Sequence, residues 1–256
     1  MTTIADLFSV RDRVALVTGA SSGIGRAMAE VLAEAGATVA LVARRTATLD
    51  VVAQGISARG GRSMVVGCDL ADHADIERLP SKLHEGIGAP DILVNAAGIN
   101  LRMPIDDVGI GDWNRTLDIN LTAPFLLAQA FAPAMVARGW GRILNVASLQ
   151  SVRAFADSAP YGASKGAIMQ LTRAMAEAWS RHGVNCNAIA PGFFRTELTA
   201  AVFDDPVRVR AMAARTMCGR NGVLDDLRGA TVFFASRASD YVTGQTLFVD
   251  GGFSAG

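Results

Sequence analysis

Short runs of hydrophobic residues alternate along the chain with longer segments in which hydrophobic residues recur every three to four positions. The short runs, bounded by turn residues, are typical of buried strands, and the periodic segments are typical of helices. The predicted strands are Val14–Thr18, Thr38–Val42, Arg62–Gly67, Asp91–Asn95, Gly141–Ala147, Val184–Ala190 and Thr246–Asp250. Seven strands separated by helices predict an α/β Rossmann fold, a doubly wound parallel sheet with helices on both faces.

Helix boundaries are marked by capping and stop residues. The expected ranges are 26–35, 73–85, 113–136, 161–182 and 225–236. Asp72 and Asp112 precede two of these helices, where a carboxylate accepts hydrogen bonds from first-turn N–H groups. Pro124 predicts a kink or break, because proline removes a helix hydrogen bond. Residues 193–223 are less regular, and we expect them to cover the strand ends as a mobile substrate lid.

Composition indicates a globular protein with a sizeable core. Half of the 256 residues are hydrophobic and 19% are charged, which excludes a disordered chain. We expect one domain, residues 1–256, since α/β folds of this length often form a single domain. Lys+Arg and Asp+Glu are balanced at 24 each, so no nucleic-acid or anionic-membrane partner is indicated.

Cysteine usage and the N-terminal residues bear on the compartment. Cys68, Cys186 and Cys218 are few and far apart, which fits a reducing compartment better than a disulfide scaffold and gives no zinc-site spacing. The first ten residues include an acid and no basic region, so no signal peptide is expected. No uninterrupted apolar run reaches the roughly 18 residues of a membrane span. We therefore expect a cytoplasmic protein.

A glycine-rich turn, Gly19–Gly25, joins the first predicted strand to the first long helix. Glycines at a strand–turn–helix junction let the backbone approach a pyrophosphate, and the helix N-terminus supplies N–H donors and positive potential. The spacing is Gly-x-x-x-Gly-x-Gly rather than the commoner Gly-x-Gly-x-x-Gly. The segment predicts a nucleotide site.

The second predicted strand is followed by Arg44 and Arg45. In an NAD site an acidic residue near this strand end binds the ribose 2′-hydroxyl, whereas an arginine accommodates a 2′-phosphate. The acidic position is empty here, and each guanidinium can bind phosphate through two donors. NADP(H) is therefore preferred over NAD(H) as the cofactor.

Tyr161 and Lys165 lie one turn apart if their segment is helical, so they share a face. A phenol ionises near pH 10 when isolated, and a nearby ammonium favours the phenolate. Gly19, Arg44, Asp69, Asn95, Ser148 and Pro191 all follow predicted strands closely. Because ligands bind beyond the carboxyl ends of parallel strands, these residues and the Tyr161–Lys165 pair define a candidate site.

Several motifs stand in a fixed order along the chain. They are Thr18-Gly-x-x-x-Gly-Ile-Gly25, Asn95-Ala-Ala-Gly98, Asn120, Ser148, Tyr161-x-x-x-Lys165 and Pro191-Gly192. Together, with Ser148 thirteen residues before Tyr161, they resemble the short-chain dehydrogenase/reductase family over nearly the whole chain. Ala96 departs from the asparagine common in that family.

The resemblance implies a catalytic tetrad. Tyr161 would exchange a proton with the carbonyl or alcohol oxygen, and Lys165 would lower the tyrosine pKa and hold the nicotinamide ribose. Ser148 would hydrogen-bond the reacting oxygen, and Asn120 would fix a water that feeds a proton relay. Donors aimed at this oxygen act where charge develops as hydride moves.

The resemblance also assigns the cofactor site, with Asp69 and Leu70 beside the adenine and Thr196 at the nicotinamide carboxamide. With the glycine turn and the arginine pair, the expected cofactor residues are Gly19, Ser21, Ser22, Gly23, Ile24, Gly25, Arg44, Arg45, Asp69, Leu70, Asn95, Ala96, Ala97, Gly98, Tyr161, Lys165, Pro191, Gly192, Phe194 and Thr196.

Within the family the chain is most similar to the sugar-acid branch, the gluconate 5-dehydrogenases and 2-deoxygluconate dehydrogenases. The similarity rests on residues 6–9, 148–151, 160–166, 194–199 and 247–252. Arg102 matches a basic position of that branch and is suited to pair with a carboxylate. Gln150 and Arg153, with Ser148 and Tyr161, complete the predicted substrate contacts. Asn221 and Leu101 depart from the branch in loops expected to face the substrate.

Two other functions remain open. A 3-oxoacyl-[acyl-carrier-protein] reductase would present a basic patch to its carrier, weakly suggested by Arg208, Arg210 and Arg215. A catalytically silent NADP-binding protein is disfavoured by the intact Ser148, Tyr161 and Lys165. The family resemblance also implies a homotetramer or a homodimer.

Overall fold

The computed structural model describes residues 2–256 and contains a parallel sheet of seven strands. The strands are β1 (Val14–Thr18), β2 (Thr38–Ala43), β3 (Arg62–Gly67), β4 (Ile92–Asn95), β5 (Gly141–Val146), β6 (Val184–Pro191) and β7 (Thr246–Val249). Their order in the sheet is β3-β2-β1-β4-β5-β6-β7. The predicted fold class is confirmed, and each predicted strand agrees with the structure to within one residue at either end. β2 and β3 are added on one side of β1, and β4 to β7 on the other, so the strand order reverses between β1 and β4. Ligands bind in the crevice at such a reversal.

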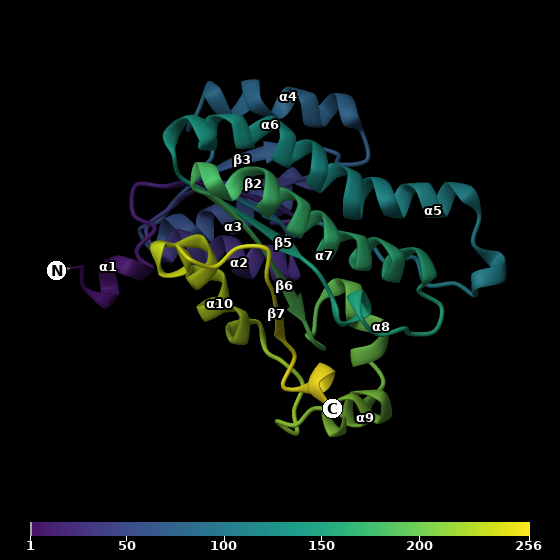
Figure 1. Ribbon diagram of the computed structural model, residues 1–256. Helices are drawn as coiled ribbons and strands as arrows, with labels where there is room; N and C mark the ends of the chain where they lie inside the picture. Colours follow the sequence, from purple (N-terminus) through teal and green to yellow (C-terminus); the bar gives the residue numbers. More distant parts are fainter. Residues whose placement is uncertain (1) are drawn as a thin grey trace.

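Helices cover both faces of the sheet (Figure 1). They are α1 (Ile4–Phe8), α2 (Gly23–Glu34), α3 (Thr46–Ala58), α4 (His73–His84), α5 (Ile110–Leu117), α6 (Ala123–Arg138), α7 (Ala159–Trp179), α8 (Ala200–Phe203), α9 (Pro206–Ala214) and α10 (Arg228–Ala235). α4, α6 and α7 lie on one face, and α2, α3 and α10 on the other. β1 shows why both faces are apolar: Leu16 packs into one core cluster, while Ala15 and Val17 pack into the opposite one, as strand geometry requires.

The helix caps test the sequence prediction at single residues. Asp72 caps α4, and its carboxylate accepts a hydrogen bond from Ala74 N at 3.0 Å. The cap predicted at Asp112 is wrong, because the helix begins at Ile110 with Gly109 as its N-cap. Pro124 does not break the helix. The stretch stays helical through a π-helical segment, Asp118–Thr122, in which the hydrogen-bonded turn widens just before Pro124.

Four helices, α1, α3, α8 and α9, were not predicted. α1 is a single short turn, and α3 carries its buried residues Leu49, Val52 and Ile56 on one face at helical spacing. The predicted helix over 225–236 is a 3₁₀ turn (Leu224–Leu227) followed by α10. The segment 193–223 contains α8 and α9, and Asp205 caps α9 through Val207 N and Arg208 N. The lid segment is thus partly helical, and its mobility stays a prediction.

The continuous helical stretch from Ile110 to Arg138 is long and apolar enough to span a membrane by length and composition alone, with a mean hydropathy of 1.4 in its best window. This differs from the expectation drawn from uninterrupted apolar runs. Half of that window is buried in the fold. Leu127, Phe131 and Met135 of α6 pack into the core cluster shared with α4, so the apolar residues serve the interior of the sheet–helix layer.

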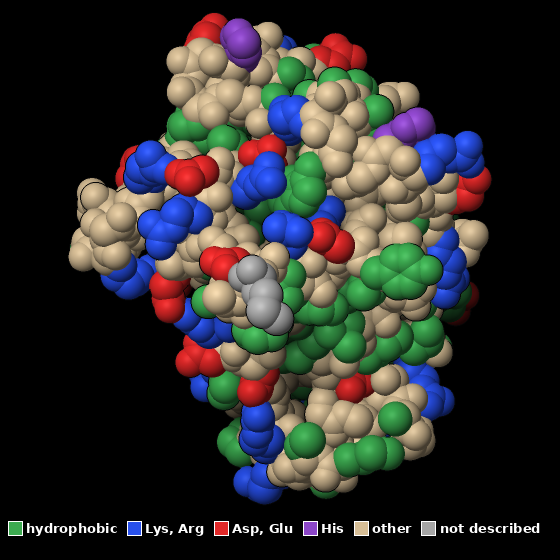
Figure 2. Space-filling view, turned by 60° about the vertical axis from the view of Figure 1, so that its left-hand side comes forward, with side chains coloured by type: hydrophobic (Ala, Val, Ile, Leu, Met, Phe, Trp, Pro, Cys, Tyr) green, Lys and Arg blue, Asp and Glu red, His purple; other side chains and the backbone are tan. Residues whose placement is uncertain are grey.

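Charges on the face shown in Figure 2 are interspersed, with Lys and Arg beside Asp and Glu. In the described residues, opposite charges form ion pairs between or within helices, such as Arg228 with Glu34 and Arg26 with Glu30. Some of the balanced positive and negative charges are therefore paired locally.

Candidate active site

A cavity of about 590 Å³ lies at the carboxyl ends of the strands. Its wall is built from the glycine turn after β1, the ends of β2 and β3, the loops after β4, β5 and β6, the start of α7, and the lid segment. Cavities of roughly 300–1,000 Å³ hold small-molecule ligands and cofactors. The location is the one predicted from the clustering of strand-end residues.

The glycine turn has the geometry of a phosphate cradle. Gly19 and Gly23 adopt positive φ values of 67° and 55°, which favour glycine. A Cβ on Gly25 would lie 2.4 Å from Gly19 O, so only glycine lets α2 start this close to β1. Ser22, the N-cap of α2, makes no side-chain capping bond. The first-turn N–H groups of α2 are therefore left for a ligand anion.

Thr18 ties the glycine turn to the loop after β4. Its hydroxyl accepts hydrogen bonds from Ala96 N and Ala97 N, each at 3.1 Å. A Cβ on Gly19 would lie 2.8 Å from Ala97 Cα, so these two loops are in direct contact. They form one continuous wall of the cavity.

Arg45 reaches back from the end of β2 to the glycine turn. Its Nη2 donates to Ser21 Oγ and Ser22 Oγ at 3.2 Å each, and to Glu197 Oε2 at 2.8 Å. Arg44 also lines the cavity and is exposed. Glu197 belongs to the lid segment and was not predicted as a site residue. No sequence signal connects it with an arginine so far away along the chain.

Asp69 and Leu70 follow β3 and line the same cavity. Asp69 N donates to Asp75 Oδ2 at 2.8 Å, and Asp69 Oδ1 accepts from Ala71 N at 3.1 Å. Asp75 is in turn paired with Lys82. These contacts fix the turn that carries the predicted adenine-facing residues.

Tyr161, Lys165 and Ser148 meet at the start of α7. Tyr161 is 9% exposed and Lys165 is 3% exposed, and the Lys165 ammonium lies 5.7 Å from the centroid of the Tyr161 ring. The Ser148 side chain lies close enough to the Tyr161 phenol to lower its pKa by hydrogen bonding. Lys165 also accepts, through its carbonyl, a hydrogen bond from Ser151 Oγ at 2.6 Å, which fastens α7 to the loop after β5.

Asn120 lies in the π-helical segment directly behind this group. Its Oδ1 accepts from Ile99 N and its Nδ2 donates to Ile99 O, both at 2.9 Å, while Nδ2 also contacts Ser164 Oγ at 3.1 Å. A Cβ on Gly98 would lie 3.3 Å from Asn120 Oδ1 and 3.7 Å from Lys165 Nζ. The π turn therefore places Asn120 beside both α7 and the loop after β4, as π-bulges at functional sites often do.

Burial dominates the titration of this group. It raises the pKa of Tyr161, opposed by the hydrogen bond from Ser148 and by the charge of Arg102. It lowers the pKa of Lys165 to about 8, because a buried ammonium loses its hydration. The charge of Arg102 lowers the tyrosine pKa, and the predicted contribution of Lys165 stays a prediction.

The residues present fit a nicotinamide dinucleotide. In the part of the chain that the structure describes, residues 2–256, the buried Lys165 ammonium donates to the Val146 carbonyl alone. An ammonium carries three donors, and leaving two of them without acceptors in a buried site is costly. Ligand hydroxyls in the cavity would satisfy them, as the free N–H groups of α2 would bind phosphate.

Most predicted site residues border this cavity, with three exceptions. Asn95 lies beneath it, where its Nδ2 donates to Asn145 Oδ1 at 2.9 Å; Asn120 lies behind Gly98. Arg153 points elsewhere: its Nη2 donates to the carbonyls of Ser254 and Gly256 at 3.4 and 2.9 Å. Arg153 does not line the cavity, and its role in substrate binding stays a prediction.

Arg102 and Gln150 border the cavity near Tyr161, together with residues that were not predicted. Phe155 and Phe193 contact each other edge to face, and both pack on Phe253. Asn100 carries a buried Oδ1 that lacks a partner within residues 2–256. The substrate side thus combines one cation, amide groups and an aromatic wall.

The chain is similar to known proteins over nearly its whole length. A family model described as "Enoyl-(Acyl carrier protein) reductase" matches residues 19–254. The chain is 41% identical to the gluconate 5-dehydrogenase of Gluconobacter oxydans and 39% identical to the 2-dehydro-3-deoxy-D-gluconate 5-dehydrogenase of Bacillus subtilis, with 97% of each chain covered in both pairs.

The solved structures agree. A gluconate 5-dehydrogenase from Burkholderia cenocepacia, crystallised with NADP and tartrate, is 42% identical with a TM-score of 0.95, covering 99% of this chain and 100% of that one. The fold, the motif order and these similarities agree over nearly the whole length. The chain belongs to the short-chain dehydrogenase/reductase family of oxidoreductases, within which it is similar to sugar-acid dehydrogenases.

Proposed function

We propose that this protein is an NADP(H)-dependent oxidoreductase that interconverts a secondary alcohol and a ketone, with a sugar acid or polyol as substrate. The observation that carries the proposal is the buried group of Tyr161, Lys165 and Ser148 at the cavity wall, with Asn120 behind it. When bound, the cofactor supplies hydride transfer. The side chains supply proton transfer and orientation.

Tyr161 is the proposed proton donor to the ketone oxygen and proton acceptor from the alcohol. Ser148 already contacts the phenol, so it is placed to hydrogen-bond an oxygen held against Tyr161. The two free donors of Lys165 are suited to hold ribose hydroxyls, and Asn120 to position a water behind the ammonium. Donors aimed at the reacting oxygen act where charge develops on it.

Tyr161→Phe tests this proposal. The variant should bind NADPH within twofold of the wild type and lose turnover by about 10³-fold, because the hydroxyl alone is removed. The chain has two tyrosines, and the other, Tyr241, is fully exposed. Tyr241→Phe is therefore a matched control that should keep full activity. Wild-type turnover in Tyr161→Phe would refute the mechanism.

The cofactor preference rests on Arg44 and Arg45 at the end of β2, with no acidic residue at the ribose position. NADP is bound in the related Burkholderia structure, which supports the preference. We assign the cofactor contacts to the predicted residues that line the cavity.

The substrate class rests on Arg102, which lies close enough to Tyr161 to lower its pKa and is suited to pair with a substrate carboxylate. The tartrate in the Burkholderia complex, itself a hydroxy acid, supports this class. An absorbance screen of NADP⁺ reduction over sugar acids, polyols and neutral alcohols tests it. Arg102→Gln should raise KM for acids more than for neutral polyols.

The 3-oxoacyl reductase alternative is less well supported. Of the three arginines expected to form a carrier patch, Arg208 pairs with Asp205 at 3.3 Å and Arg215 stacks on Phe253 at 4.3 Å. Oxidation of NADPH in the presence of acetoacetyl thioesters, followed by absorbance, measures this activity directly. A single-domain protein, a cytoplasmic location and a homotetrameric or homodimeric assembly complete the proposal, and light scattering would establish the subunit number.

A further inference from the structure

The lid segment carries a carboxylate that binds the same groups as the proposed cofactor phosphate. Glu197 Oε2 accepts from Arg45 Nη2 at 2.8 Å and from Ser22 Oγ at 3.0 Å, and Glu197 Oε1 faces Arg45 Nη1 at 3.4 Å. Arg45 Nη2 also contacts Ser21. An anion from the lid is thus held by donors of the glycine turn and of the end of β2.

These donors are also where a 2′-phosphate is expected. An arginine after the second strand accommodates that phosphate in NADP sites, and the hydroxyls of Ser21 and Ser22 contact Arg45 here. A guanidinium already paired with a carboxylate has fewer donors and less net positive potential for a second anion. Glu197 and the 2′-phosphate would therefore compete for the donors of Arg45.

We propose that Glu197 is a specificity-determining residue that weakens binding of the 2′-phosphate and so narrows the difference in affinity between NADP(H) and NAD(H). This inference rests on the proposed function, because it concerns the cofactor of that site. It assigns to the lid a charge that acts on the adenosine end of the cofactor, away from Tyr161.

An alternative role for Glu197 would be to hold the lid segment over the cavity. The neighbouring contacts argue that the turn is seated without it. Thr196 packs against Gly23, where an added Cβ would lie 3.2 Å from the Thr196 side chain. Thr199 Oγ1 donates to Phe194 O at 2.6 Å and accepts from Thr196 N at 3.0 Å. These contacts close the turn independently of the ion pair.

The ion pair itself is half-exposed, with side-chain exposures of 50% for Arg45 and 63% for Glu197. Such a pair contributes little to stability. The Arg45 and Ser22 hydrogen bonds lower the pKa of Glu197, so the carboxylate is ionised at neutral pH. Its main consequence is therefore a negative charge beside a phosphate site.

Glu197→Gln removes the charge and keeps an acceptor for Arg45 and Ser22. Dissociation constants for NADPH, NADH, 2′,5′-ADP and 5′-ADP should be measured by calorimetry or fluorescence, without substrate or turnover. We expect the variant to bind NADPH and 2′,5′-ADP about threefold to tenfold more tightly, with NADH and 5′-ADP changed less than twofold. Glu34→Gln, which removes the charge from the similarly exposed pair with Arg228, is the matched control and should change none of the four.

Two results would overturn the proposal. Equal weakening of NADPH and NADH would show that Glu197 holds the lid closed, and unchanged constants would show that its charge does not reach the phosphate. Arg44→Ala separates these from failure of the proposed function. If wild type prefers NADPH and Arg44→Ala loses that preference while Glu197→Gln changes nothing, only this inference fails. If wild type binds NADPH no better than NADH and Arg44→Ala has no effect, the NADP assignment fails as well.

Discussion

β5 has a buried cation at each end. Arg142, the second residue of the strand, is 2% exposed, and at the other end the Val146 carbonyl accepts a hydrogen bond from Lys165, which is 3% exposed. The two positions are four residues apart along the strand, a separation of roughly 13 Å. Burial lowers the pKa of both side chains. The two sites differ in how far the surrounding residues compensate for the burial of the charge.

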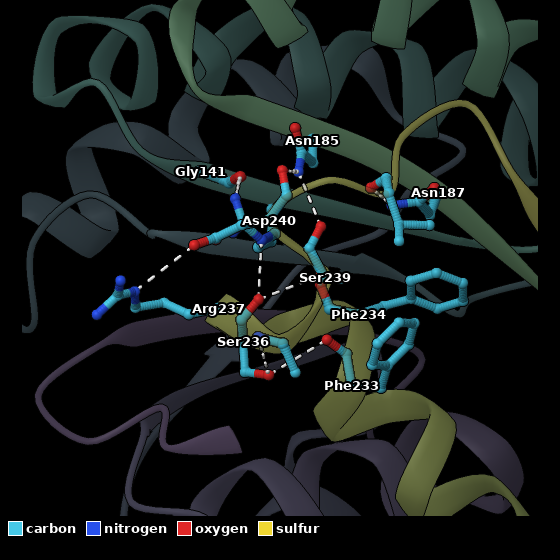
Figure 3. Close-up of polar contacts among 12 residues, drawn as sticks. Gly141, Asn185, Asn187, Phe233, Phe234, Ser236, Arg237, Ser239 and Asp240 are labelled. Carbon is cyan, nitrogen blue, oxygen red and sulfur yellow. Dashed lines mark hydrogen bonds and ion pairs between the residues drawn. The ribbon is translucent and has the colours of Figure 1, made fainter. Parts of the chain in front are cut away.

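Arg142 is surrounded by acceptors. It pairs with the Asp240 carboxylate, donates to Ser236 O at 3.2 Å and to Gly141 O at 2.8 Å, and lies over the Trp140 ring at 4.5 Å. Figure 3 shows this region, where the carbonyls of Ser239 and Asp240, after α10, accept hydrogen bonds from Asn185 of β6. The charge and hydrogen bonds of Asp240 raise the Arg142 pKa against the effect of burial.

Lys165 has a single carbonyl and no carboxylate among its contacts in residues 2–256. The two ends of β5 thus differ in how many hydrogen-bond donors of the buried cation the protein satisfies. A buried charge whose donors are satisfied by the protein joins elements together, whereas one left partly unsatisfied beside a cavity is ready for a ligand. The comparison predicts opposite effects of neutralising the two cations.

Lys165→Met gives the largest expected effect. Turnover should fall about 10³-fold, equivalent to about 4 kcal/mol of barrier. Stability should rise by roughly 2 kcal/mol at pH 7, because the penalty for the buried ammonium disappears while one hydrogen bond is lost. Steady-state kinetics and urea unfolding of the same preparation measure both. A destabilised variant would contradict the view that Lys165 is uncompensated.

Arg142→Met should do the reverse. Ser236 O and Gly141 O lose their donor and Asp240 loses its partner, so unfolding should require roughly 3 kcal/mol less. The kcat of the folded enzyme should stay within twofold, since the change lies at the far end of β5. Arg228→Met, which removes a surface partner of Glu34, controls for loss of any arginine and should cost under about 1 kcal/mol. If Arg142→Met were as stable as the wild type, Arg142 and Lys165 would not differ in the way proposed.

The two cations were not equally predictable. Tyr161 and Lys165 are four residues apart on one helix and Ser148 follows a strand, so local spacing and the strand-end rule are enough to bring them together. Arg142 stands within an apolar strand, and its partners Ser236 and Asp240 come more than ninety residues later. Nothing local marks it as buried. Glu197 is similar, since its partner Arg45 is 152 residues away.

The fold was also predictable only where local sequence patterns determine the structure. Strand positions follow from short apolar runs, and all seven were predicted to within a residue. The π turn around Asn120 was not, because a single widened turn leaves hydrophobic periodicity almost unchanged, and Pro124 indicated a break instead. Arg153 was assigned to the substrate by its place in a loop, whereas its contacts with Ser254 and Gly256 depend on where the C-terminus folds.

The smallest expected effect is a pH dependence that tests the Lys165 side of the comparison alone. The pKa of Lys165 is lowered from 10.5 to about 8 in the folded protein. Below pH 8 the folded and unfolded chains both carry the proton, so the full penalty for burial is present. Between pH 8 and 10.5 the unfolded chain binds more protons than the folded one, so this group makes stability rise with pH.

Lys165→Met lacks this group, so its stability advantage over the wild type should shrink by about 2 kcal/mol between pH 7 and pH 10. Other titrating groups are common to both proteins and cancel in the difference. Urea midpoints of the two proteins, measured side by side at half-unit steps of pH, give the curve. A difference that stays constant across this range would show that Lys165 keeps a normal pKa and that its ammonium finds compensation in the folded protein, as Arg142 does.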